Sequence, residues 1–175
     1  MAREVRIELY NPAWKDQYTQ TEHILRGIFN DLIIDIQHIG STSIEGLSAK
    51  PIIDILIVVN NIEAVDTFND TMAAHGFLAK GEYGIPGRRY FSGTLLSDPG
   101  VSTHHVHMYQ VGNPKYQEEL LFRDYLRIDE GVLRAYEALK IELAERLRHD
   151  PGAYTDAKAD FIRNTIHKAC TYLDR

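Results

Sequence analysis

One carboxylate, Asp54, interrupts an otherwise apolar run of residues from Ile52 to Val59. An ionised side chain that is buried without a partner is strongly destabilising. The sequence therefore predicts that a cation, a hydrogen-bond donor or a metal ion lies beside this carboxylate. We interpret Asp54 as a candidate catalytic and metal-binding residue.

Three histidines lie close together in residues 103–109. If this segment is a strand, alternation places His105 and His107 on one face and His104 on the other. Two imidazoles at this spacing can share a metal ion or a phosphate. With Asp54 on a neighbouring strand they form a candidate catalytic and metal-binding set that suits zinc, manganese or iron better than magnesium. A divalent metal of open identity is the expected cofactor; the alternative is a surface histidine pair hydrogen-bonded to a carboxylate.

A short polar turn before the Asp54 strand consists of Gly40, Ser41, Thr42 and Ser43. Small residues allow the backbone to approach a ligand closely. Their N–H groups and hydroxyls suit phosphate oxygens, especially if Ser43 caps a short helix that follows. A tight turn with only local hydroxyl capping is the alternative. The turn is therefore a candidate phosphate-binding segment.

Four cationic side chains are candidates for holding the same phosphate. Adjacent residues of a strand point to opposite faces, so only one of Arg88 and Arg89 can face the histidines. Lys50, directly before Pro51, could reach a phosphate in the turn, and Lys158 could reach it from the last helix. For both lysines the alternative is a solvated side chain.

Composition limits the class of protein. The chain has 175 residues, 44% of them hydrophobic, and no linker rich in proline, glycine or serine, so we expect a single domain over residues 1–175. A net charge of -6 makes nucleic acid an unlikely partner compared with a nucleotide or another phosphorylated small molecule. The lone Cys170 excludes an intrachain disulfide and is expected in the core. Without a membrane-length apolar run or a signal peptide, a cytoplasmic location and no membrane partner are expected.

The periodicity of apolar residues predicts both strands and helices. Strands are expected over residues 33–39, 51–59, 77–83, 88–95 and 102–111. Turns at 84–87 and 97–100 favour an antiparallel meander between the last three. Helices are expected over residues 12–30, 62–75 and most of the chain after 113, where the charged residues of 137–148 form a solvated face. The predicted fold class is α/β (α+β), a mixed sheet of about five strands with helices packed against it and a helical C-terminal third.

Short motifs are distributed along nearly the whole chain: Tyr10-Asn-Pro-Ala-Trp14, His38-Ile-Gly-Ser-Thr-Ser43, Ala49-Lys-Pro-Ile-Ile-Asp-Ile-Leu56, Gly87-Arg-Arg89, His104-His-Val-His107, Phe122-Arg-Asp-Tyr-Leu126, and Tyr154 with Lys158 and Phe161-Ile162. In this order they resemble the GrpB family. The resemblance implies a nucleotidyltransferase-like fold of the DNA polymerase beta superfamily. It also implies a family whose members are sometimes fused to dephospho-CoA kinase.

The wider superfamily holds two magnesium ions with an Asp-x-Asp pair that follows a Gly-Ser turn and with a third carboxylate on a later strand. By this resemblance Gly40 and Ser41 match the turn and Asp54 matches the second aspartate. Ile52 stands at the first position, and the later strand carries histidines. Two hard divalent ions need several oxygen ligands, so the usual two-metal phosphoryl transfer is not expected.

Three functions remain open. The first is a nucleotidyltransferase-like enzyme that binds a nucleotide or phosphorylated small molecule at the turn and transfers a nucleotidyl or phosphoryl group. In it Asp54, His105 and His107 hold one metal and an arginine stabilises developing charge. The second is a catalytically inactive nucleotide-binding module linked to coenzyme A metabolism. The third is a metal-dependent hydrolase in which the same three residues activate water.

Overall fold

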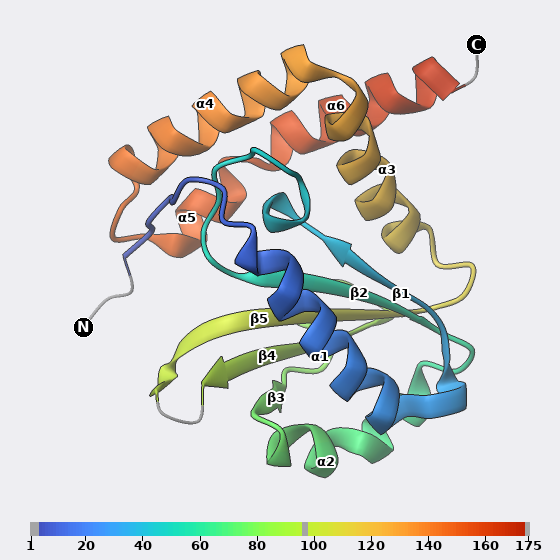
Figure 1. Ribbon diagram of the computed structural model, residues 1–175. Coiled ribbons are helices and arrows are strands. Elements are labelled where there is room, and N and C mark those ends of the chain that lie inside the picture. Colours follow the sequence, from blue (N-terminus) through green and yellow to red (C-terminus); the bar gives the residue numbers. More distant parts are fainter. Residues whose placement is uncertain (1–3, 96–97, 174–175) are drawn as a thin grey trace.

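A mixed β-sheet forms the centre of the computed structural model, which describes residues 4–95 and 98–173 (Figure 1). Within these residues the strand order is β1-β2-β5-β4-β3. The strands are β1 (Ile33–Ile39), β2 (Ile53–Val59), β3 (Phe77–Ala79), β4 (Arg88–Leu95) and β5 (Asp98–Gln110). β2 and β5 run parallel, and the other neighbours are antiparallel. The predicted mixed sheet of about five strands is confirmed.

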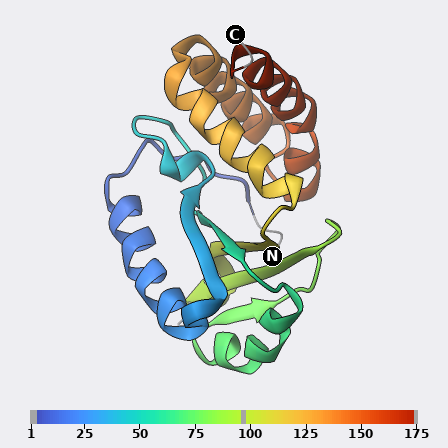
Figure 2. The ribbon, with the colours of Figure 1, turned by 90° about the vertical axis from the view of Figure 1, so that its right-hand side faces the viewer.

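Six α-helices surround the sheet in the described part of the chain. They are α1 (Ala13–Phe29), α2 (Asn69–Ala74), α3 (Pro114–Ile128), α4 (Glu130–Arg146), α5 (Pro151–Asp156) and α6 (Ala159–Leu173). Figure 2 shows α1 along one side of the sheet and the C-terminal helices gathered over one end of it. The predicted helical C-terminal third is thus confirmed. None of the described helices combines the length and the apolar character needed to cross a bilayer.

The two faces of the sheet have different roles because side chains alternate along each strand. Ile53, Ile55 and Ile57 of β2 are fully buried against α1 and belong to the largest apolar cluster of the described residues. Asp54 and Leu56 point to the opposite face. There, Leu56 packs with residues of β5 and α3, whereas Asp54 lies farther along, where the packing gives way to a cavity.

Several predicted boundaries are wrong. Residues 63–68 of the helix predicted over 62–75 form a 3-10 helix, because apolar residues at 62, 65 and 68 recur every three residues, the period of that helix. The strand predicted over 77–83 ends at Ala79, since Gly81 and Tyr83 adopt positive φ. The turn predicted at 97–100 is strand from Asp98 onward. Ser97 lies outside the described residues.

The environment expected for the cysteine is also wrong. Cys170 is exposed on α6, while its neighbour Ala169 is fully buried. Successive residues of a helix are rotated by roughly 100° about the axis, so an apolar stripe shifted by one position changes which residue faces the core. Cys170 therefore makes no contribution to the core packing that its helical pattern suggested.

Candidate functional site

A cavity of about 750 Å³ opens on the sheet face opposite α1. It is bounded by the turn after β1, by side chains of β2, β4 and β5, by residues of α4 and α5, and by Lys158 in the link between α5 and α6. Most of the predicted site residues line it: Gly40, Ser41, Thr42, Lys50, Asp54, Arg88, His105, His107 and Lys158. Ser43 and Arg89, which were also predicted to bind phosphate, do not line it.

The strand register brings the carboxylate and both histidines together. In the parallel pairing of β2 with β5, Asp54 stands opposite His105, and His107 follows two residues later on the same face. The Nδ1 atom of His105 lies 3.1 Å from Oδ1 of Asp54, a hydrogen-bond distance. The Nε2 atom of His107 lies 3.9 Å from the same oxygen, too far for a hydrogen bond. The sequence predicted a partner beside Asp54, and the structure shows that this partner is a pair of imidazoles.

A second carboxylate completes this cluster and was not predicted. Glu119 of α3 places Oε1 3.6 Å from Nδ1 of His107. The hydroxyl of Tyr109 donates a hydrogen bond of 2.6 Å to the same oxygen. His107 thus lies between two carboxylates, Asp54 at its Nε2 side and Glu119 at its Nδ1 side. In the sequence, Glu119 resembled any other charged residue of an amphipathic helix.

These neighbours shift the protonation of both central groups. Burial opposes ionisation of Asp54, but the hydrogen bond of His105 and the charges of His105 and His107 outweigh it and lower the pKa of Asp54 well below its ordinary range. Burial alone would lower the pKa of His107. The charges of Glu119 and Asp54 overcome that effect and raise the pKa of His107 to about 9. In the absence of a metal ion, His107 therefore carries a positive charge between the two carboxylates.

The cluster fits one transition-metal ion. One ligand atom from each of Asp54, His105 and His107 lies within 4.8 Å of the other two. Ligands at zinc-like distances of about 2.1 Å are roughly 3.4 Å apart in a tetrahedral arrangement, so small side-chain movements suffice. The Nε2 atom of His107 is buried and makes no hydrogen bond, as expected of a ligand atom. With a single carboxylate among the three, the set does not fit two magnesium ions.

Lysines define the opposite wall of the cavity. The ammonium groups of Lys50 and Lys158 lie over the ring of Tyr154, at 4.8 and 4.5 Å from its centroid. Lys140 of α4 is 2% exposed and donates a hydrogen bond to the backbone oxygen of Ser48. Among the described residues, neither Lys140 nor Lys158 has a carboxylate within ion-pair distance.

The proximity of these lysines changes their acidity. Burial, and then the charge of Lys158, lower the pKa of Lys140 to about 7. Burial, and then the charge of Lys50, lower the pKa of Lys158 to about 8. One buried and one partly buried ammonium group, neither with a carboxylate partner in the described part of the chain, favour binding of an anion, which would restore the charged form of each. Lys140 was predicted to lie on a solvated helix face; its burial corrects that prediction.

The two adjacent arginines separate as strand alternation requires. Arg88 is 5% exposed and lies at the cavity, where its Nη1 atom is 3.5 Å from Nδ1 of His107. Its Nη2 atom donates a hydrogen bond of 2.7 Å to the backbone oxygen of Tyr83. Arg89 points to the other face and pairs with Asp66 at 2.6 Å. Arg88 is therefore the arginine that faces the histidines.

The turn after β1 approaches Asp54 closely but offers few free hydroxyls. Gly40 has φ 69°, and a Cβ atom there would lie 3.0 Å from Cβ and Cγ of Asp54, so a glycine is required. Thr42 donates its hydroxyl to the backbone oxygen of Ile52 at 3.1 Å. Ser43 lies inside a single 3-10 turn rather than capping a following helix, and its hydroxyl donates to the Gly40 oxygen at 2.7 Å. The turn therefore contributes mainly Gly40 and Ser41 to the cavity.

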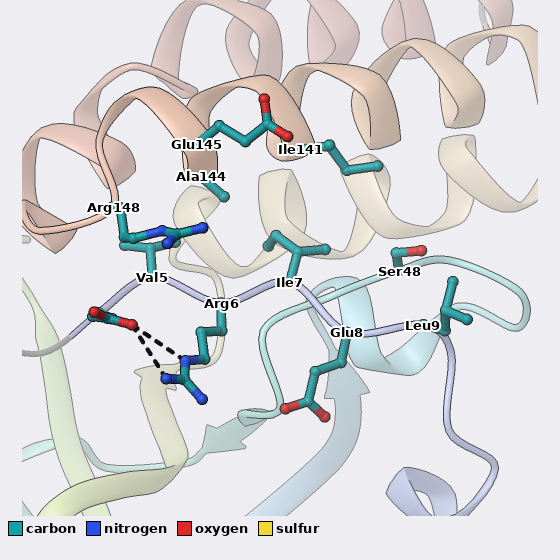
Figure 3. Close-up of a pocket in the computed structure, with 11 residues that line it drawn as sticks. Val5, Arg6, Ile7, Glu8, Leu9, Ser48, Ile141, Ala144, Glu145 and Arg148 are labelled. Atoms are coloured by element: carbon teal, nitrogen blue, oxygen red, sulfur yellow. Dashed lines mark hydrogen bonds and ion pairs between the residues drawn. The ribbon is translucent and has the colours of Figure 1, made fainter.

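A second cavity, of about 680 Å³, lies between residues 4–9 and α4 (Figure 3). Its wall combines the apolar side chains of Val5, Ile7 and Ile141 with charged groups such as Glu145 and Arg148. The three residues of the candidate metal cluster are not among those that line it. The chemistry that the sequence predicts is thus concentrated in the first cavity.

Comparison with known proteins gives a consistent family. Residues 4–168 match the family model described as GrpB protein. The UPF0157 protein YqkA of Bacillus subtilis is 44% identical over 167 residues, which cover 95% of this chain and 48% of that protein. The crystal structure of conserved protein GrpB from Enterococcus faecalis is 34% identical, with a TM-score of 0.90 over 97% of this chain and 100% of that one.

A larger relative carries a named activity. A dephospho-CoA kinase of Mycolicibacterium paratuberculosis is 28% identical over 192 residues, which cover 97% of this chain and 47% of the kinase. The chain therefore spans about half the length of this kinase and of the Bacillus relative.

Proposed function

The chain belongs to the GrpB family, and from this premise we propose that it binds a nucleotide or another phosphorylated small molecule in the cavity around Asp54. We further propose that it transfers a nucleotidyl or phosphoryl group with the help of one divalent metal ion. Asp54, His105 and His107 would hold the metal. Lys50, Lys158 and Arg88, together with the backbone of the Gly40 turn, would hold the phosphates.

One observation carries this proposal: a single cavity combines a carboxylate and histidine cluster with the buried Lys140 and the partly buried Lys158, neither of which has a carboxylate partner among the described residues. The cluster at Asp54 favours a cation. Lys140 and Lys158 favour an anion. A phosphate ester that binds a metal ion satisfies both requirements at once, whereas a free metal or a free anion satisfies only one.

The protein residues have distinct roles in the proposed reaction. A bound metal ion would polarise a phosphoryl oxygen and so assist attack at phosphorus. Arg88, anchored by the backbone oxygens of Glu82 and Tyr83, holds its positive charge at the histidine cluster and would stabilise charge that develops there. Lys158 would orient the phosphate from the opposite wall. Gly40 allows the backbone to lie against Asp54, which leaves room for a ligand oxygen.

Turnover by the purified protein tests the proposal. Each common nucleoside triphosphate would be incubated with Mn²⁺ or Zn²⁺, with water alone or with dephospho-CoA as the acceptor. Release of pyrophosphate would report nucleotidyl transfer, and release of nucleoside diphosphate would report phosphoryl transfer. His107→Ala should abolish metal-dependent turnover. His75→Ala serves as the control, since His75 lies outside the cavity and bonds only to the backbone of its own helix. Turnover that is unchanged in His107→Ala, or that needs no metal, contradicts the proposal.

Two other outcomes would identify the other functions. Nucleotide binding without turnover would indicate a catalytically inactive nucleotide-binding module linked to coenzyme A metabolism, a role that the similarity to a dephospho-CoA kinase supports. Tight metal binding without nucleotide affinity, together with hydrolysis of a substrate other than a nucleotide, would indicate a metal-dependent hydrolase. The internal hydrogen bonds of the Thr42 and Ser43 hydroxyls favour the hydrolase, because they reduce the capacity of the turn to bind phosphate.

A further inference from the structure

Tyr83 lies in the loop between β3 and β4, lines the cavity and is nevertheless 64% exposed. One face of its ring stacks on Tyr90, with centroids 4.8 Å apart and planes inclined by 8°. Tyr90 itself is 8% exposed. A large apolar ring that is supported from one side and open to solvent on the other offers a flat surface to a ligand.

The loop holds Tyr83 in a backbone conformation that tyrosine rarely adopts. Its φ is 45°, and Gly81 and Gly84, which lie on either side of it in the sequence, also have positive φ values, of 60° and 83°. Such conformations are costly and concentrate where a ligand or a reaction requires them. Two contacts fix this one: the Tyr83 backbone oxygen accepts a hydrogen bond of 2.7 Å from Arg88, and Gly87 donates one of 2.7 Å to Glu82. The position of the ring is therefore determined by the fold.

The ring of Tyr83 lines the same cavity as the candidate metal cluster and is linked to it through Tyr90. Tyr90, on which it stacks, makes an edge-to-face contact with His107 at 5.2 Å between centroids. Arg88 links the same groups, since its guanidinium lies 4.9 Å from the centre of the Tyr90 ring. A planar group on the open face of Tyr83 would thus be linked to His107 through the rings of Tyr83 and Tyr90. This arrangement allows one ligand to reach both the ring and the cluster.

We propose that Tyr83 is the stacking residue of the cavity, and that the ligand carries a planar heteroaromatic ring in addition to its phosphates. This inference rests on the proposed function, because it assumes that a phosphorylated compound occupies the cavity. It narrows the substrate class to nucleotides and nucleotide-like coenzymes and excludes simple sugar phosphates. Lys158 and the metal cluster would hold the phosphates, while Tyr83 would select the ring.

A comparison of two probes tests this inference. The dissociation constants of the nucleoside triphosphates and of inorganic triphosphate would be measured with Mn²⁺ for the wild type, Tyr83→Ala and Tyr83→Phe. Stacking of a base on an aromatic ring corresponds to roughly a tenfold change in affinity or more. We expect Tyr83→Ala to weaken binding of the preferred nucleotide at least tenfold and to leave triphosphate binding unchanged. Tyr83→Phe, which keeps the ring, should bind both probes as the wild type does.

The controls separate this inference from the proposed function. Tyr172→Ala removes another exposed tyrosine, on α6 and outside the cavity, and should change neither constant. If both probes bind to the wild type and Tyr83→Ala weakens neither, or weakens both equally, the stacking role is overturned and the proposed function stands. If neither probe binds to the wild type, both proposals are overturned. Alanine and phenylalanine tolerate positive φ about as poorly as tyrosine, so the backbone effect is matched.

Discussion

The two walls of the cavity present different charged groups to a ligand. On the sheet wall, the carboxylate of Asp54 faces His105 and His107, and Glu119 of α3, which does not line the cavity, lies on the other side of His107. On the helical wall, the buried Lys140 and the partly buried Lys158 have no carboxylate partner among the described residues, and the pKa of each is lowered. The first wall therefore favours a cation and the second an anion. A metal-bound phosphate compound complements both walls, whereas either wall by itself would indicate only a metal ion or only an anion.

The walls also differ in how the fold positions them. Asp54 and His105 are register partners on adjacent strands, so backbone hydrogen bonds determine their separation. Lys50, Lys140 and Lys158 come from three distant segments that meet only when the C-terminal helices pack over the sheet. We therefore expect metal binding to depend on single residues of the sheet wall, and anion binding to be shared among several groups of the helical wall.

Asp54→Asn should cause the largest change in binding, a loss of metal affinity at the sheet wall. The substitution keeps the shape of the side chain but removes the one carboxylate of the metal set. Loss of groups that only orient a ligand lowers metal affinity by about 10–100-fold, so loss of a ligand should lower it at least 100-fold. Titration calorimetry with Zn²⁺ or Mn²⁺ measures this change. Asp66→Asn, in the Arg89 pair on the other face, is the control and should leave metal affinity unchanged. If Asp54→Asn retained its metal affinity, the assignment of the cluster as a metal site would be wrong.

Anion binding to the helical wall should weaken as pH rises. The pKa of Lys140 is lowered to about 7 and that of Lys158 to about 8, so both ammonium groups are charged below these values and lose charge above them. Lys158→Met should reduce affinity for inorganic triphosphate about tenfold near pH 7, as expected for one charged hydrogen bond. The difference from wild type should shrink above about pH 9.

Two features make this second test specific. Titration of the probe affects wild type and variant alike, so only the difference between them reports on Lys158. Lys168→Met, at a position on α6 outside the cavity, should bind as the wild type does at every pH. A difference that grows with pH would mean that Lys158 does not hold the anion through its charge.

The sheet wall could be predicted from the sequence because strand periodicity determines it. An isolated carboxylate in an apolar strand and histidines two residues apart on another strand specify the face of each side chain, and adjacent strands leave little freedom in their separation. The same alternation predicted that Arg88 and Arg89 diverge. Which of the two faces the cavity depended on the loop at residues 82–83, whose backbone oxygens bind Arg88.

The helical wall could not be predicted in the same way. Lys140 belongs to a run of charged residues that matches a solvated helix face, and only the packing of α4 against Ser48 buries it. Glu119 likewise faces His107 because α3 crosses the sheet at that point. The period of a helix indicates which residues share a face, but not which element will cover that face.

Glu119→Gln should reduce metal affinity about tenfold, less than the loss of a ligand. Glu119 faces the Nδ1 side of His107 and so orients the ring with its Nε2 atom toward Asp54. Carboxylates in this position typically change metal affinity by 10–100-fold. Calorimetry under the conditions used for Asp54→Asn measures the change. Glu118→Gln is a matched control, because Glu118 is the preceding residue and pairs with Lys115 at the surface. If the two substitutions changed metal affinity equally, Glu119 would have no specific role in orienting His107.

Arg89→Ala should have the smallest effect and defines the boundary between the two faces of the sheet. Its partner Asp66 is 47% exposed, and pairs of this kind contribute less than about 1 kcal/mol to the free energy of unfolding. Chemical denaturation should therefore show a small loss of stability, while affinities for metal and for triphosphate remain unchanged. Because Arg88 and Arg89 are neighbours of the same charge, a loss of triphosphate binding in Arg89→Ala would mean that the cavity lies on the α1 side of β4. That result would reverse the assignment of the two faces on which the whole site depends.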